Sequence, residues 1–77
     1  MPRYYLHVHN HEDSTDLEGT ELADDVAACK EAVVTAGEML RDDPDKFWND
    51  QDWWVRVDDE ASATVCEVRL SGRRRSV

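Results

Sequence analysis

One long helix-forming segment, in a chain otherwise patterned for strands, restricts the fold most. Residues 24–41 place apolar side chains at spacings of three and four, which makes one stripe along a helix. The expected stripe consists of Val26, Cys29, Val33, Ala36 and Leu40. Asp24 is a suitable N-cap, and Pro44 disfavours helix at the residue before it. Because an apolar stripe must be buried against another element, the rest of the chain has to supply a sheet face.

Three other segments alternate apolar and polar residues, which is the period of a half-exposed strand. They are residues 3–10, 53–58 and 64–70, and the polar link between the last two predicts a hairpin. The polar residues 10–20 predict a loop, with a short extra strand at 17–22 as the alternative.

Asp43 and Pro44 are suited to open a second, short helical turn. That turn would direct Phe47 and Trp48 toward the core. The sequence therefore predicts one α+β domain over residues 1–70, in the order β-α-β-β. A three-stranded, mainly antiparallel sheet would carry the long helix on one face, and residues 71–77 would form a flexible Arg-rich tail.

The two faces of the predicted sheet differ in character. The face expected to meet the helix holds Leu6, Val8, Val55, Val57, Cys66, Val68 and Leu70. The opposite face is expected to hold Tyr5, His7, His9, Trp54, Arg56, Val65, Glu67 and Arg69. Tyr and Trp are favoured at interfaces, and a domain of 77 residues gains stability from association. We therefore expect a symmetric homodimer whose interface uses Tyr5, His7, His9, Trp54, Arg56, Glu67 and Arg69. The alternative is a monomer with a strand register shifted by one residue at Trp53 and Trp54.

Three histidines at every second position support another interpretation. His7, His9 and His11 share one side of a strand, and neutral imidazole is a common ligand of divalent transition metals. The spacing of histidines and cysteines matches no closed metal site, so solvated histidines on an open sheet explain the row as well. Binding of a metal or a small ligand by this row is the second functional hypothesis; no cofactor is otherwise expected.

Charge and motifs restrict the other classes of function. The net charge of −9 argues against binding nucleic acid through general phosphate attraction, although Arg73, Arg74 and Arg75 are basic. No nucleophile elbow, phosphate loop or reactive-cysteine signature is present, so we do not expect an enzyme. No apolar run suits a membrane span or a signal peptide, and we expect a cytoplasmic protein in which Cys29 and Cys66 are free buried thiols rather than a disulfide.

Three motifs resemble those of a family of small bacterial proteins of unknown function. They are the opening Met-Pro-Arg-Tyr-Tyr-Leu-His-Val-His, the run from Leu17 to Leu22 (Leu-Glu-Gly-Thr-Glu-Leu) before an Ala-rich helix, and the segment that follows Trp54. The resemblance covers residues 1 to about 70 and implies a fold unit and a bacterial source without an activity. The sequence thus favours a small non-catalytic module that self-associates or binds a protein partner.

Overall fold

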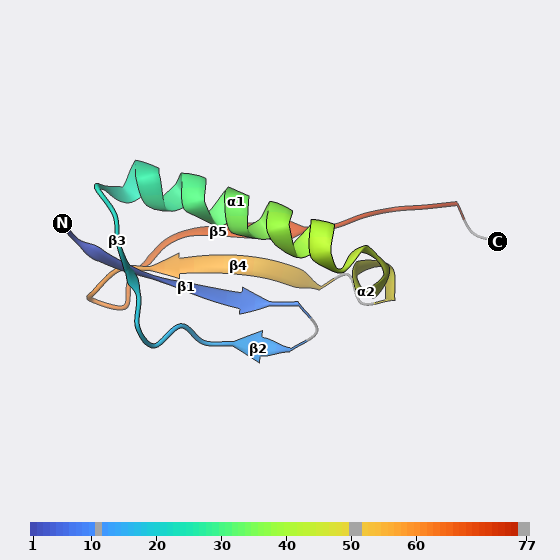
Figure 1. Cartoon of the computed structure of the whole chain (residues 1–77), viewed down its shortest axis with the longest axis horizontal. Coiled ribbons are helices and arrows are strands. Elements are labelled where there is room, and N and C mark those ends of the chain that lie inside the picture. Colours follow the sequence, from blue (N-terminus) through green and yellow to red (C-terminus); the bar gives the residue numbers. More distant parts are fainter. Residues whose placement is uncertain (11, 50–51, 76–77) are drawn as a thin grey trace.

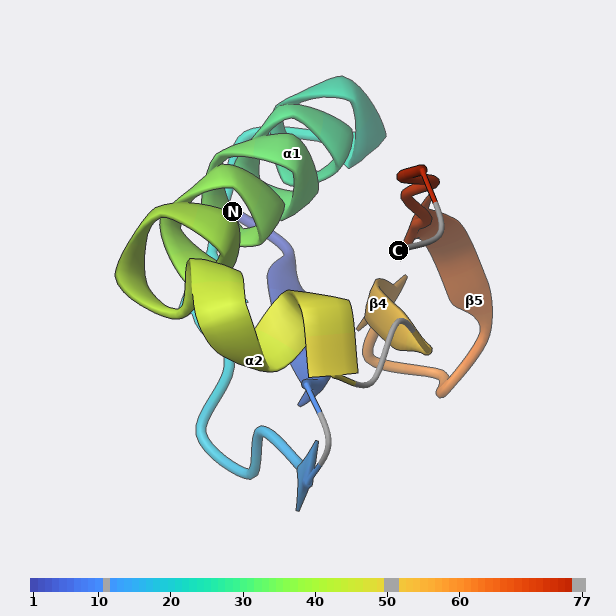
Figure 2. The ribbon, with the colours of Figure 1, turned by 90° about the vertical axis from the view of Figure 1, so that its right-hand side faces the viewer.

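The computed structural model describes residues 1–10, 12–49 and 52–75. Its elements are β1 (Arg3–His9), β2 (Asp13–Ser14), β3 (Thr20–Glu21), α1 (Asp25–Asp42), α2 (Pro44–Asn49), β4 (Trp53–Asp58) and β5 (Thr64–Leu70). Helix α1 lies along one face of the sheet, and α2 lies at the end of α1 (Figures 1 and 2). This is the predicted α+β fold, and within the described residues no helix has the length and apolarity that crossing a membrane requires.

The sheet has the order β2-β1-β4-β5, and β3 also pairs with β1. All of these pairings are antiparallel. The sheet thus has five strands and not the three predicted: β2 lies within the predicted loop at residues 10–20, and β3 lies within the 17–22 segment named as the alternative. Figure 2 shows β2 and β5 at opposite sides of the sheet.

The boundaries of α1 follow from local signals in the sequence. The side chain of Asp24 accepts a hydrogen bond from the backbone N–H of Ala27 at 2.9 Å, which is the predicted N-cap. At the other end, α1 stops at Asp42, and α2 begins with Pro44 at its first position. Phe47 is buried as predicted and meets Trp53 edge to face, with ring centroids 5.4 Å apart.

The predicted helix stripe is confirmed for Ala36, and Cys29 and Leu40 are half-buried, but the stripe is wrong for Val26 and Val33. The buried residues of α1 are Ala28, Ala32 and Ala36, whereas Val26 and Val33 are 63% and 61% exposed. The sheet contributes the bulky side chains of the core, and the alanines allow the helix to approach them closely. The bulky sheet residues in this core are Tyr4, Val55 and Val57. The valine stripe lies about 100° around the helix from the alanine stripe, since each helical residue turns by that angle.

Two other predicted placements are also wrong. Val65 does not lie on the face opposite the helix, because the pairing of β5 passes from Cys66 opposite Val57 to Thr64 opposite Asp58. Val65 is the extra residue of this bulge, and it packs against the core on the side of α1. Trp48 does not enter the core: it is 36% exposed, and the Arg74 guanidinium lies 5.4 Å from the centre of its ring.

Candidate functional site

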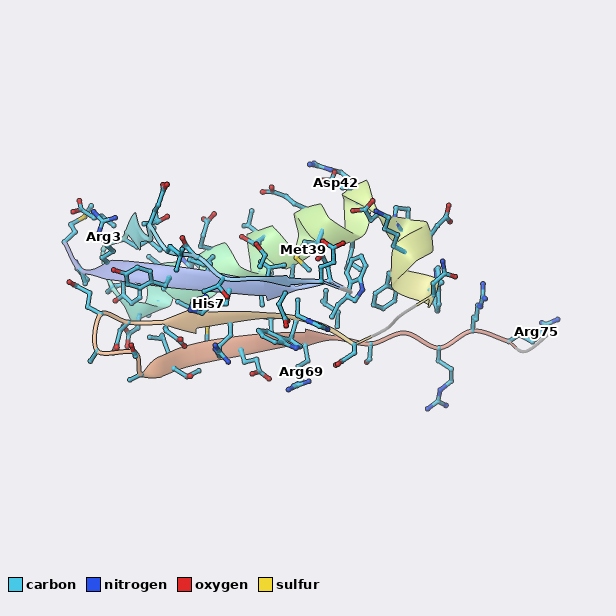
Figure 3. All side chains as sticks on the ribbon, turned by 90° about the horizontal axis from the view of Figure 1, so that it is seen from below. Arg3, His7, Met39, Asp42, Arg69 and Arg75 are labelled. Carbon is cyan, nitrogen blue, oxygen red and sulfur yellow. The ribbon has the colours of Figure 1, made fainter. Side chains whose placement is uncertain are left out.

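The sheet face opposite α1, called here the open face, carries the residues predicted to form an interface. Register places His7 opposite Arg56 and His9 opposite Trp54. The next strand adds Glu67 opposite Arg56 and Arg69 opposite Trp54. Trp53 is 1% exposed on the helix side, so the register shift considered for the two tryptophans does not occur. Figure 3 views the molecule from below, with His7 and Arg69 labelled.

Aromatic and cationic side chains cover Trp54 within the chain itself. The His9 ring stacks on Trp54 with centroids 5.5 Å apart and planes 12° apart. The Arg56 guanidinium carbon lies 5.4 Å from the centre of the same indole. Trp54 is therefore half-buried without any partner molecule, and the bare apolar patch that motivated an open-face dimer is reduced.

The charges of the open face are paired with one another. Arg69 Nε lies 2.6 Å from Glu67 Oε1, and Arg56 Nε lies 3.3 Å from Asp58 Oδ1. The Arg56 contact is electrostatic only, because this buried Nε has no aligned hydrogen-bond acceptor. These charges thus have ionic partners of opposite sign within the chain itself. Its role as an interface stays a prediction.

His7 is fixed by contacts at both ring nitrogens. Its Nδ1 accepts a hydrogen bond from the backbone N–H of Asp16 at 3.2 Å, and its Nε2 lies 3.2 Å from Asp58 Oδ2. An accepting Nδ1 places the proton of a neutral ring on Nε2, the nitrogen that lies beside the Asp58 carboxylate. Both nitrogens are therefore occupied, and binding of a metal by His7 would require breaking one of these contacts.

The other predicted metal ligands are distributed as follows. His9 Nδ1 lies 2.6 Å from Asp13 Oδ1, and His11 lies outside the described residues. Among residues 1–10, 12–49 and 52–75, no three side chains of His, Cys, Asp or Glu are arranged to hold a metal ion. The histidine row as a metal site stays a prediction.

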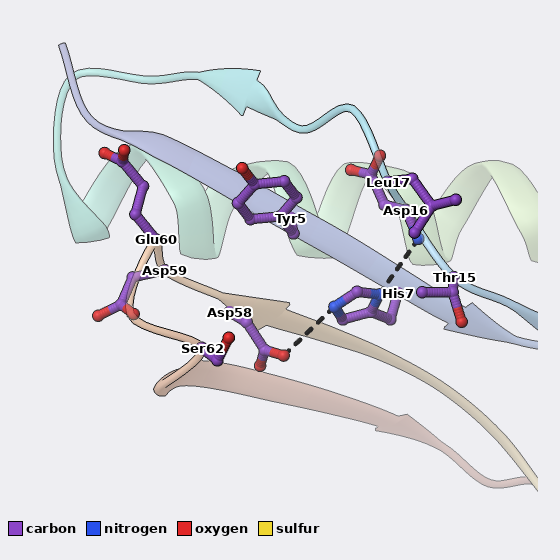
Figure 4. Close-up of a pocket in the computed structure, with 9 residues that line it drawn as sticks. All are labelled: Tyr5, His7, Thr15, Asp16, Leu17, Asp58, Asp59, Glu60 and Ser62. Atoms are coloured by element: carbon purple, nitrogen blue, oxygen red, sulfur yellow. Dashed lines mark hydrogen bonds and ion pairs between the residues drawn. The ribbon is translucent and has the colours of Figure 1, made fainter.

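A polar hollow of about 280 Å³ lies between the end of the hairpin and the loop before β3 (Figure 4). Tyr5, His7 and Asp58 form its sheet side. The carboxylates around it already accept hydrogen bonds from the backbone: Asp59 from Ala61 and Ala63, and Glu60 from Arg3. These acids hold the turns in place, which is a structural role.

Asp16 organises the loop beside this hollow. Its carboxylate accepts hydrogen bonds from the backbone N–H groups of Leu6, Glu18 and Gly19 at 3.0–3.1 Å. Partial burial raises the pKa of Asp16, but these three donors and nearby His7 outweigh it and lower the pKa below its usual value. The carboxylate that caps the edge of β1 is therefore held in its charged form.

A second surface, which sequence reasoning did not find, lies between α1 and β5. It is an apolar groove of about 450 Å³ lined by Asp25, Val26, Cys29, Lys30, Val33 and Val65. The groove exists because the alanines turn toward the sheet and leave the valines exposed beside β5. The signal for this groove in the sequence is the line of valines on the helix, which the predicted stripe places in the core.

The outer edge of β5 runs beside this groove. In the described part of the chain, β5 pairs only with β4. Its outward N–H and C=O groups therefore have no strand partner there, an arrangement that favours pairing with another chain. We refer to the edge of β5 together with the groove as the β5 edge surface.

A comparison with protein families places the chain. The model of the family described as domain of unknown function DUF6894 matches residues 3–71. The chain belongs to this family. The resemblance noted from the sequence, to a family without an established activity, is thereby confirmed. No curated protein and no solved structure gives a significant match.

Proposed function

We propose that this DUF6894 domain is a non-catalytic module that forms a symmetric dimer through its β5 edge surface. The observation that carries the proposal is the unpaired edge of β5 beside the exposed valines of α1. An exposed strand edge is normally protected by charge, bulges or a covering element, and one flanked by apolar side chains is suited to association. A second copy of the chain supplies the complementary surface.

The charges of β5 suit an antiparallel pairing with itself. When the two-fold axis passes through Val68, Glu67 of each copy lies opposite Arg69 of the other, giving two attractive pairs. The same register sets Cys66 opposite Leu70 on the side of the helices. Over residues 66–70, polar residues thus meet polar residues, and apolar residues meet apolar residues.

The exposed valines lie at the same level as this axis. β5 and α1 run in the same direction (Figure 1), and the Cys29 thiol is close enough to Cys66 to raise its pKa. Four helical residues span about 6 Å, and two strand residues span about 6.6 Å. Val33 therefore lies level with Val68, where the helices of both copies flank the joined strands.

The proposal retains part of the interface expected from the sequence. Glu67 and Arg69 belong to both surfaces, whereas Tyr5, His9 and Trp54 lie on strands away from the pairing. A module of this kind with two free thiols suits a reducing compartment such as the bacterial cytoplasm.

Sedimentation equilibrium over micromolar to millimolar protein tests the proposal. We expect the mass to rise from 8.9 kDa toward twice that value. Val33→Asp should keep the protein monomeric, because it places a charge in the apolar centre of the dimer. Val34→Asp is the matched control: Val34 is 51% exposed on the same helix, does not line the groove, and should leave association unchanged.

Trp54→Ala separates the two candidate surfaces. Dimerisation that survives Trp54→Ala and is lost in Val33→Asp supports the β5 edge surface. Dimerisation lost only in Trp54→Ala would support the open face and overturn the proposal, as would a wild-type protein that stays monomeric throughout the concentration range.

A further inference from the structure

The two cysteines of the chain meet between α1 and β5. Cys29, on the helix, lines the groove together with Val65, and Cys66, the next residue of the strand, packs against the core beneath the helix, so the two thiols are close enough for Cys29 to affect the pKa of Cys66. Both are free and half-buried. Two neighbouring thiols on different elements can be joined where their Cα atoms reach the separation of about 4.4–6.8 Å that a disulfide needs.

The surroundings of the two thiols differ. Cys66 lies on the helix side of the sheet, opposite Val57, and packs against the core. Burial, reinforced by the nearby Cys29 thiol, raises the pKa of Cys66 to about 11. Cys29 lines the groove and is the thiol that a reagent in solution reaches. The nucleophile that starts any exchange is therefore Cys29, and Cys66 is the thiol that completes it.

We infer that Cys29 and Cys66 form a redox-modifiable pair that closes to an intramolecular disulfide by exchange with a low-molecular-weight disulfide such as oxidised glutathione. The Cys29 thiolate attacks one sulfur of the reagent, forms a mixed disulfide and expels the first reagent thiolate. Cys66 then loses its proton, attacks the Cys29 sulfur and expels the second. Both cysteines are oxidised, and the reagent is reduced to two thiols that carry the two protons.

The disulfide would have a defined consequence for the fold. It would join α1 covalently to the edge strand across a segment of 36 intervening residues. Closing a loop of this size restricts the unfolded chain strongly, so the oxidised protein should melt higher by on the order of 10 °C. The inference concerns the same groove as the proposed dimer and does not depend on dimerisation.

Intact-mass spectrometry after incubation with oxidised glutathione tests the pair, with the monomeric Val33→Asp protein studied beside the wild type. We expect a product lighter than the reduced protein by two hydrogens, a higher melting temperature, and reversal of both by a reducing agent. Cys66→Ser should instead accumulate the mixed disulfide at Cys29, and Cys29→Ser should react far more slowly.

Other products would overturn the inference. A stable mixed disulfide on the wild-type protein would show that Cys66 does not complete the exchange. Disulfide-linked dimers or unmodified protein would show that the two thiols do not join within one chain. Under the proposed function the Val33→Asp protein is monomeric. If it forms the intramolecular disulfide and the wild-type protein also proves to be monomeric, the proposed dimer is refuted and the redox-modifiable pair is not.

Discussion

The two edges of the sheet differ in how well they are covered. The edge of β1 is covered: β2 and β3 pair with it, and between them the Asp16 carboxylate accepts the hydrogen bond of the Leu6 backbone N–H. The edge of β5 has no such cover in the described chain. The segment from β2 to β3 thus protects one edge, whereas the other is left beside exposed valines. This difference is the physical basis for proposing the β5 edge, and not the edge of β1, as the site of association.

The largest expected effect comes from removing the cover of β1. Asp16→Ala deletes the acceptor of three backbone donors, and each hydrogen bond to a charged group contributes about 1.5–3 kcal/mol at most. Because Asp16 is only partly buried, we expect a loss of about 3 kcal/mol in total. Urea denaturation measures this loss, and a change below about 1 kcal/mol would show that Asp16 does not hold the edge.

Gly19→Ala should destabilise the same loop by about 2 kcal/mol. Gly19 has φ of 75°, and an added Cβ would lie 2.8 Å from Arg3 Cγ and 3.0 Å from the Tyr4 carbonyl oxygen. Gly37→Ala is the control, because its Cβ would meet nothing within 4 Å and the exposed helix should gain about 0.5–1 kcal/mol. Equal effects of the two substitutions on the urea midpoint would contradict the assigned role of Gly19.

The covered edge should also respond to alkaline pH through Tyr4. Its hydroxyl donates a 2.7 Å hydrogen bond to Asp25, which, with burial and nearby carboxylates, raises the pKa of Tyr4 to about 12. Since the folded pKa exceeds the unfolded value of about 10, this stabilisation is complete below pH 10 and is lost as the pH rises toward 12. In Tyr4→Phe the melting temperature should depend less on pH between about pH 10 and 12 than in the wild type. An unchanged dependence would refute the role of Tyr4.

At acid pH, the contribution of Asp16 to stability changes with pH in the opposite direction. Its folded pKa lies below the unfolded value, so its stabilisation is complete above about pH 4 and is lost as the pH falls through the folded pKa. Asp16→Asn should therefore reduce the dependence of stability on pH below that point, which acid titration of the unfolding transition would show. If the stability of the variant depends on pH as that of the wild type does, other carboxylates cause the acid response.

The smallest expected effect concerns the uncovered edge. Arg69→Glu turns two attractive pairs across the proposed dimer axis into two repulsive pairs, which should weaken dimerisation about tenfold. Arg75→Glu makes the same charge change in the tail and should leave the dissociation constant close to that of the wild type. A similar weakening by both would mean that net charge, and not the register of β5, controls association.

Much of this fold could be predicted from the sequence because its signals are local. Alternation located β4 and β5, and the Asp24 cap and Pro44 located the ends of α1. The rotation of α1 could not be predicted in the same way, because it depends on how much space the sheet side chains leave for alanine or valine. The bulge at Val65 depends on pairing with β4, which periodicity in one strand does not contain.

The candidate site was predicted in part for the same reason. Alternation placed His7, His9, Trp54, Arg56 and Arg69 on one face, and the register confirms that placement. It could not show that Asp16 and Asp58 occupy both nitrogens of His7, since these contacts join distant parts of the chain. The groove beside β5 was missed because the exposed valines were assigned to the core.

Cross-linking at the proposed two-fold axis tests the central claim most directly. With Cys29 and Cys66 replaced by serine, Val68→Cys should form an intermolecular disulfide readily under mild oxidation, because the two copies of this position face each other across the axis. Val34→Cys in the same background is the control and should cross-link slowly. Rapid dimer formation at position 68 alone is the result predicted; equal rates at both positions would contradict pairing through β5.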